Sequence, residues 1–137
     1  MTTMRISAWI GIVLSTIGVF LKVVRVMRQA EWWPFFAYDY IAAAMILVGA
    51  WLVLRRGAPG RLLAAGWGFG VAMCYGSFFG HLEHFLNHQG KDLSFEKTMS
   101  ISVGVLLAIN TLGLVLALLP GKAAAEAIAA RPQAKAA

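Results

Sequence analysis

Residues Leu62–His88 read LLAAGWGFGVAMCYGSFFGHLEHFLNH, and this segment indicates the architecture of the whole chain. It begins as an apolar, glycine-rich run that is long enough to cross a hydrocarbon core of about 30 Å, and it ends in three histidines and a glutamate. Because an α-helix has about 3.6 residues per turn, small residues and then histidines follow one face of this segment. The members of that face are Gly66, Gly70, Cys74, Ser77, His81, His84 and His88. Small residues let helix backbones approach closely, so we expect this face to pack against other helices.

The other side of the same predicted helix is bulky and apolar. It carries Trp67, Val71, Tyr75, Phe78, Leu82, Phe85 and Leu86. In a bundle whose small faces pack on protein, the bulky faces adjoin the acyl chains. The pattern therefore predicts that Trp67 and its neighbours along this face meet lipid.

Three more apolar runs of similar length accompany this segment. The four predicted spans are residues 6–27, 35–54, 62–87 and 97–119. The chain of 137 residues is 60% hydrophobic and only 13% charged, with a mean hydropathy of +0.73, whereas about a quarter of the residues of a soluble domain are charged. We therefore predict an all-α, integral membrane four-helix bundle that forms one domain over residues 1–121. Residues 122–137 form a short alanine-rich tail.

The net charge of +6 comes from basic residues at the predicted helix ends and in the tail. That placement indicates membrane orientation and does not indicate a nucleic-acid partner. Four spans put both termini and the loop between spans two and three on one side, with seven basic residues against five on the other. The positive-inside rule then predicts an integral protein of the bacterial inner membrane with both termini in the cytoplasm.

Asp39 lies about one turn inside the second span. It shares a face with Ala42, Ala43, Ile46 and Ala50. A carboxylate that faced lipid there would cost on the order of 2.5–3.5 kcal/mol, so we expect Asp39 to face the bundle and to be paired or protonated. The alternative is an interfacial aspartate that the positive end of the helix dipole favours.

Lys22 and Arg25 continue the small-residue face of the first span, after Gly11, Ser15 and Gly18. This shared face favours an inward orientation of both side chains, whereas long basic side chains at a helix end also reach outward to the headgroups. In the last span, Asn110 is predicted to form a hydrogen bond between helices.

The ionisable residues of the first three spans lie toward the same membrane side. We name this predicted group the polar cup, and its ligand-binding residues are Lys22, Arg25, Asp39, His81, Glu83 and His84. The cup would open on the side opposite the termini. Because histidines titrate near neutrality, such a group could also relay protons.

The spacing of His81, His84 and His88 places imidazoles on one helical face, which is compatible with a divalent transition metal. Haem is disfavoured within one chain, because the other spans contain no histidine to serve as the second axial ligand. Cys74 is the single cysteine, which excludes an intrachain disulfide and the Cys-x-x-Cys chemistry of four-span quinone-reducing enzymes.

Three functions fit this pattern. The first is binding or transport of an ion or a small amphiphilic ligand in the polar cup. The second is a non-catalytic subunit of a larger membrane complex or of a homo-oligomer, which would dock through the charged end of the bundle. The third is a small membrane enzyme that uses a histidine–carboxylate pair on a lipid-like substrate. The pattern favours a protein that is not an enzyme. We expect its partner to be the lipid bilayer around it.

Overall fold

The computed structural model describes residues 2–29, 37–87 and 93–119, which form a bundle of α-helices. The helices are α1 (Thr2–Gln29), α2 (Ala37–Arg56), α3 (Arg61–Leu86) and α4 (Leu93–Leu118). All four are long and apolar enough to cross a membrane, and the described part of the chain contains no strand. The predicted all-α four-helix membrane bundle is therefore confirmed. The predicted tail, residues 122–137, lies outside the described residues.

The predicted span agrees best with the observed helix for α3. The largest differences are at the starts of α1 and α4, because these helices begin earlier than predicted, at Thr2 and Leu93. Both helices start among polar residues, before the apolar run on which the prediction depended. A helix satisfies its backbone hydrogen bonds internally whatever its side chains are, so it continues into the headgroup region without an apolar sequence.

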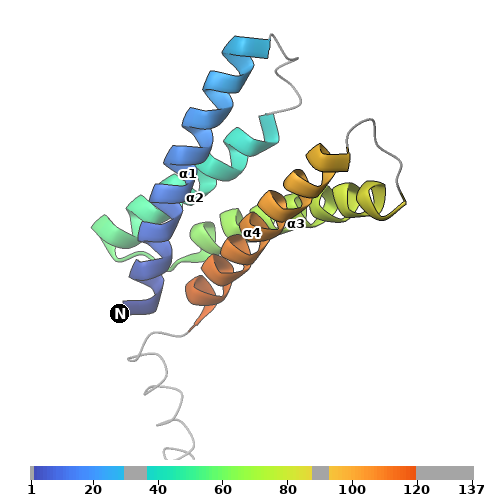
Figure 1. The fold of residues 1–137 in the computed structure, drawn as a ribbon. Helices are drawn as coiled ribbons and strands as arrows, with labels where there is room; N and C mark the ends of the chain where they lie inside the picture. Colours follow the sequence, from blue (N-terminus) through green and yellow to red (C-terminus); the bar gives the residue numbers. More distant parts are fainter. Residues whose placement is uncertain (1, 30–36, 88–92, 120–137) are drawn as a thin grey trace, which may run out of the picture.

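Each helix packs beside its neighbour in the chain, and α1 also packs beside α4, which closes the ring of four. The turn between α2 and α3 is short, and Gly57 in it has φ +60°, a left-handed conformation that glycine adopts without a steric cost. The start of α1, this turn and the end of α4 lie at one end of the bundle (Figure 1). We call it the terminal end, and the opposite end the far end.

Trp67 of α3 is the centre of the packed core. Its side chain is fully buried, and its indole Nε1 donates a hydrogen bond to Ser7 Oγ of α1 at 2.9 Å. Ser7 Oγ in turn donates to the backbone carbonyl oxygen of Gly113 in α4 at 2.8 Å. The indole lies directly on Gly113, where a Cβ would overlap its ring atoms. One side chain and one hydroxyl therefore connect α1, α3 and α4.

The prediction that Trp67 meets lipid is wrong. An indole N–H has no hydrogen-bond acceptor among acyl chains, and the buried Ser7 hydroxyl supplies one inside the bundle. Gly113 supplies the space, because it has no side chain where the ring lies. Farther along the same face, Tyr75 and Leu86 are exposed, as predicted.

The α2–α3 contact is equally close. A Cβ on Gly49 would approach the backbone nitrogen of Leu63 to 2.5 Å, so only glycine permits this distance between the two helices. Around these contacts the buried apolar side chains form one cluster, whose members are Ala8, Ile46, Ala50, Val53, Leu63, Trp67 and Ala117. The cluster lies toward the terminal end, so the tightest packing of the bundle is there.

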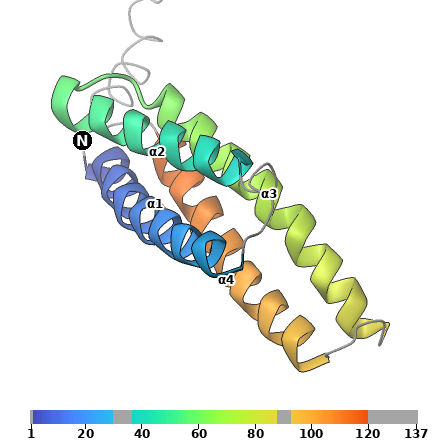
Figure 2. The same cartoon turned by 90° about the horizontal axis from the view of Figure 1, so that it is seen from above.

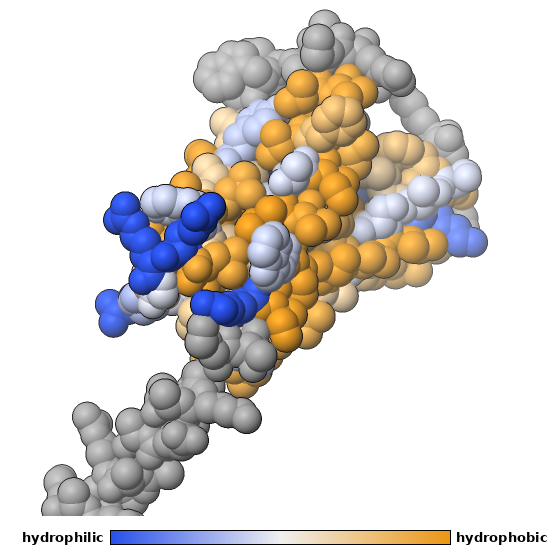
Figure 3. Space-filling model, turned by 90° about the vertical axis from the view of Figure 1, so that its left-hand side faces the viewer, coloured by the Kyte–Doolittle hydropathy of each residue, from blue (hydrophilic) through white to orange (hydrophobic). Residues whose placement is uncertain are grey.

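Away from the terminal end, the α1–α2 pair and the α3–α4 pair diverge (Figure 1). In the view from above, α3 and α4 extend farther from the terminal end than α1 and α2 do (Figure 2). The face shown in Figure 3 is mostly hydrophobic, with hydrophilic residues gathered toward its edges. On α1, for example, Trp9, Val13 and Phe20 are all more than half exposed. Such a surface suits contact with the lipid bilayer.

The first prediction concerns the core. Trp67→Ala should lower the free energy of unfolding by about 3 kcal/mol, because it removes the packing on Gly113 and takes away the donor that Ser7 accepts from. The matched control is Trp9→Ala, since Trp9 is 60% exposed; it should cost less than about 1 kcal/mol. Denaturant titration in detergent micelles, followed by circular dichroism, measures both. Equal losses for the two variants would contradict the assignment of Trp67 to the core.

Candidate functional site

A cavity of about 350 Å³ lies between the four helices, on the far-end side of the Trp67 core. Its volume is in the range of small-molecule sites, about 300–1,000 Å³. Most of its wall is apolar and comes from α1 and α2, including Leu14, Ile17 and Ala43. The polar side chains that line it are Ser15, Lys22, Asp39, Tyr40, Cys74 and Asn110. We call it the four-helix cavity.

An ion pair between α1 and α2 lines the cavity. Lys22 Nζ lies 2.5 Å from Asp39 Oδ2, and the two side chains are 32% and 26% exposed. Asp39 lies in the first turn of α2, where the helix dipole favours a negative charge. Its Oδ2 atom is buried and accepts no further hydrogen bond from the described residues besides this contact with Lys22. Among the described residues, the Lys22 charge therefore compensates this carboxylate oxygen.

Ser15 and Asn110 bring polar groups to a deeper part of the wall. Ser15 is 93% buried, since only 7% of its surface is exposed, and its hydroxyl makes no hydrogen bond within the described residues. Asn110 Nδ2 donates to the carbonyl oxygen of Leu106 at 2.8 Å and lies 3.8 Å from Cys74 Sγ. The predicted interhelical hydrogen bond of Asn110 is therefore present, to the weak sulfur acceptor of Cys74 on α3, and a second, shorter bond stays within α4.

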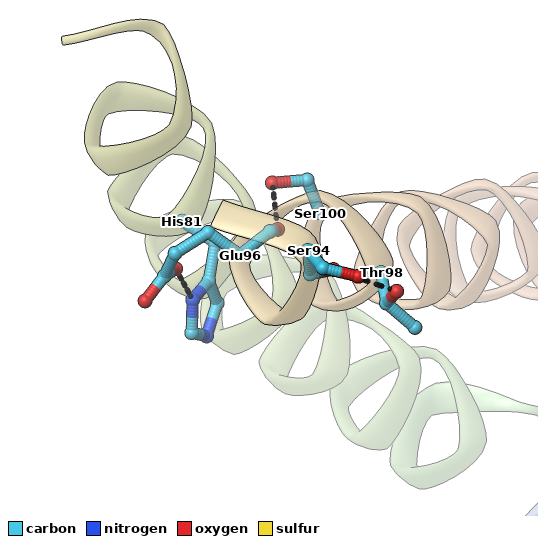
Figure 4. A network of polar contacts seen from close by, with 5 residues as sticks. All are labelled: His81, Ser94, Glu96, Thr98 and Ser100. Atoms are coloured by element: carbon cyan, nitrogen blue, oxygen red, sulfur yellow. Dashed lines mark hydrogen bonds and ion pairs between the residues drawn. The ribbon is translucent and has the colours of Figure 1, made fainter. Parts of the chain in front are cut away.

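A second polar contact joins α3 to α4. His81 Nδ1 lies 2.6 Å from Glu96 Oε2, and the two side chains are 26% and 14% exposed (Figure 4). The ring of Phe95 meets His81 edge-on, with 6.3 Å between the ring centres. The hydroxyls of Thr98 and Ser100 donate to carbonyl oxygens four residues earlier in α4, so they do not compete for His81. Within the described residues, Glu96 is the group that holds this imidazole.

The described residues of the predicted polar cup thus do not form one site. Lys22 and Asp39 line the four-helix cavity, whereas His81 contacts Glu96 and does not line it. Glu83 and His84 are exposed.

Arg25 belongs to α1, but its side chain lies outside the described residues, as does His88. Among the residues that the structure describes, no three histidine, cysteine or acidic side chains gather closely enough to hold a metal ion. Because His88 is outside that description, the proposed metal ligands His81, His84 and His88 stay a prediction.

Sequence reasoning missed Glu96 as the partner of His81 and Ser15 as an unpaired hydroxyl in the cavity. One signal could have found Glu96. His81 lies five residues before the end of α3 and Glu96 three residues after the start of α4, so the two lie at similar distances from the connection between these antiparallel helices. No comparable signal exists for Ser15, because the cavity depends on how the helix pairs diverge.

No protein-family model, curated protein or solved structure matches this chain. The fold and its side chains therefore carry the functional argument alone. They define the class of the protein, which is a small membrane protein built of four apolar helices with a cavity between them.

The second prediction tests the His81–Glu96 contact with a double-mutant cycle. We expect His81→Ala and Glu96→Ala to show a coupling energy of about 1 kcal/mol in the free energy of unfolding. A fully buried pair would couple more strongly, but both side chains are partly exposed and water screens their interaction. The control cycle combines His84→Ala with Glu96→Ala, because His84 is exposed and lies one turn farther along α3. It should show additive effects. Additivity in the first cycle as well would mean that the contact does not hold α3 against α4.

Proposed function

We propose that the protein binds a small amphiphilic molecule in the four-helix cavity, either to hold it or to carry it across the membrane. The observation that carries this proposal is a carboxylate oxygen of Asp39 that is buried in the wall of an apolar cavity and paired, within the described residues, with the ammonium group of Lys22. Apolar walls favour an apolar ligand body, and the Lys22–Asp39 pair favours a polar head.

A bare metal ion fits this cavity less well than an amphiphile. Hard cations take six or more oxygen ligands, whereas Asp39 is the one carboxylate in the cavity wall that the structure describes. Most of the remaining wall offers hydrocarbon, which cannot replace the hydration shell of an ion. An amphiphile uses both parts of the wall, so it is the ligand class that we propose.

For the location, we propose the bacterial inner membrane with both termini in the cytoplasm. The support is the excess of basic residues on the terminal side, seven against five. The start of α1 and the end of α4 at one end of the bundle agree with termini on a shared side. In this orientation, the Lys22–Asp39 pair lies toward the periplasmic half of the bilayer.

The third prediction tests that orientation. In a Cys74→Ser background, Asn87→Cys and Pro59→Cys place single exposed thiols after α3 and in the α2–α3 turn. A membrane-impermeant maleimide should label Asn87→Cys in intact bacterial cells and Pro59→Cys only after the cells are permeabilised. The reverse pattern would place the termini in the periplasm.

The fourth prediction tests the cavity itself. Gly18 lines the cavity and has nothing within 4 Å of the position of a Cβ, so Gly18→Phe fills the cavity without disturbing the backbone. The probe is N-phenyl-1-naphthylamine, an uncharged dye that fluoresces in dry apolar sites, titrated at fixed detergent concentration. The wild type should show a saturable component, and Gly18→Phe should weaken it by about tenfold or more.

The matched control for that experiment is Gly76→Phe. Gly76 also has nothing within 4 Å of its Cβ position, but it does not line the cavity. This variant should bind the dye as the wild type does. Equal binding in all three proteins, or a signal that only follows detergent partitioning, would refute the proposed ligand cavity.

A further inference from the structure

The ionic and apolar parts of the cavity follow one another along the helices. Asp39 lies in the first turn of α2, close to the far-end boundary of the bundle, and Lys22 faces it from α1. From this pair the wall continues toward the middle of the bundle through apolar residues such as Ile17, Ala43 and Ile46. In a bilayer, the ionic end of the cavity would lie at headgroup depth and its mostly apolar remainder at acyl-chain depth, which is the order of groups in a membrane lipid.

Among the side chains that the structure describes, the far end of the cavity carries one ammonium, Lys22, and one carboxylate, Asp39. An anionic head attracted to Lys22 would also lie beside Asp39, because the two groups are only 2.5 Å apart. A cationic head at Asp39 would in the same way lie beside Lys22. Each singly charged head thus meets a like charge, which is costly in a site with apolar walls. A head that carries both charges meets a counter-charge at each position.

From this arrangement we propose that the occupant is a phospholipid with a zwitterionic head that bears a primary ammonium group. The phosphate contacts Lys22 and the ammonium contacts Asp39, so the ligand inserts between two groups that otherwise pair with each other. This inference rests on the proposed ligand cavity and adds the identity of the head. The partial exposure of both side chains, 32% and 26%, leaves them accessible to such a head.

The primary ammonium is specified by the hydrogen bonding of Asp39. Oδ2 lies 2.5 Å from the Lys22 ammonium and accepts from no other described group, so it needs a new donor once the phosphate draws Lys22 away, and a primary ammonium has three N–H donors to offer. A trimethylammonium head carries the same charge without a donor, so it satisfies the charge and leaves the acceptor unpaired. An N–H donor to a carboxylate forms the stronger, charge-assisted type of hydrogen bond.

The unpaired hydroxyl of Ser15 suits the part of the lipid below its head. Ser15 precedes Lys22 by seven residues on α1, which is about 10.5 Å along the helix axis toward the middle of the bundle. It is 93% buried, lines the cavity and makes no hydrogen bond within the described residues. The ester carbonyls of a phospholipid are acceptors on the chain side of the phosphate, and Ser15 is a donor on that side.

The experiment is a lipid titration of the full-length protein in mild detergent, read by native mass spectrometry. The probes are phosphatidylethanolamine, phosphatidylcholine and phosphatidylglycerol with identical acyl chains. The wild type should bind phosphatidylethanolamine about tenfold more tightly than either of the others. In Asp39→Asn the order should reverse, with phosphatidylglycerol tightest, because Lys22 then faces no carboxylate from α2. Equal binding of the three lipids by the wild type, or an unchanged order in Asp39→Asn, would overturn the proposal.

Two controls show whether a change in lipid preference comes from Asp39 itself and whether the cavity has folded in the variant. Glu83→Gln removes an exposed carboxylate outside the cavity, and it should leave the order of the three lipids unchanged. Binding of N-phenyl-1-naphthylamine by Asp39→Asn reports that the cavity has folded. If the dye binds and no lipid is preferred, the ligand cavity stands and the zwitterionic head is wrong. Displacement of the lipid by free phosphoethanolamine at equal concentration would show that the site recognises the head alone, and would overturn a lipid as its occupant.

Discussion

An indole N–H inside a membrane must find a hydrogen-bond acceptor within the protein, and the rest of this bundle depends on how Trp67 finds one. The acceptor is Ser7 on α1, whose own hydroxyl reaches the backbone of Gly113 on α4. Lipid is as apolar as a leucine side chain, so burial of hydrocarbon alone does not drive these helices together. Close packing on glycine and two short hydrogen bonds do so at the terminal end.

This concentration of packing at one end has a consequence at the other. Where the α1–α2 and α3–α4 pairs diverge, each pair is held by its own polar contact: Lys22 with Asp39, and His81 with Glu96. The first contact borders the four-helix cavity and the second does not. The same four helices therefore provide a closely packed end and an end with a cavity. The Lys22–Asp39 pair lies at the cavity, and the His81–Glu96 pair lies away from it.

The amino-acid sequence predicts the four spans and the small-residue faces of α1, α2 and α4, because apolar length and helical periodicity are properties of each segment alone. Ile46, Ala50 and Asn110 are buried on the faces where periodicity places them. The sequence does not predict the burial of Trp67, because that depends on Gly113, which lies 46 residues away and on another helix. For the same reason the sequence places Asp39 and His81 at one end of the bundle but does not separate them into two contacts. Rotation and divergence of the helices are properties of the assembled bundle.

The Trp67 contacts close the terminal end and leave a ligand-sized space beside the Lys22–Asp39 pair. A structure of the protein in a lipid bilayer, at a resolution that shows side chains, would display both features. We expect the Trp67 indole within hydrogen-bond distance of Ser7 and continuous density of a bound amphiphile between the Lys22–Asp39 pair and Ser15. A Trp67 side chain among acyl chains, with α1 and α2 packed onto α3 and α4 along their whole length, would contradict this expectation.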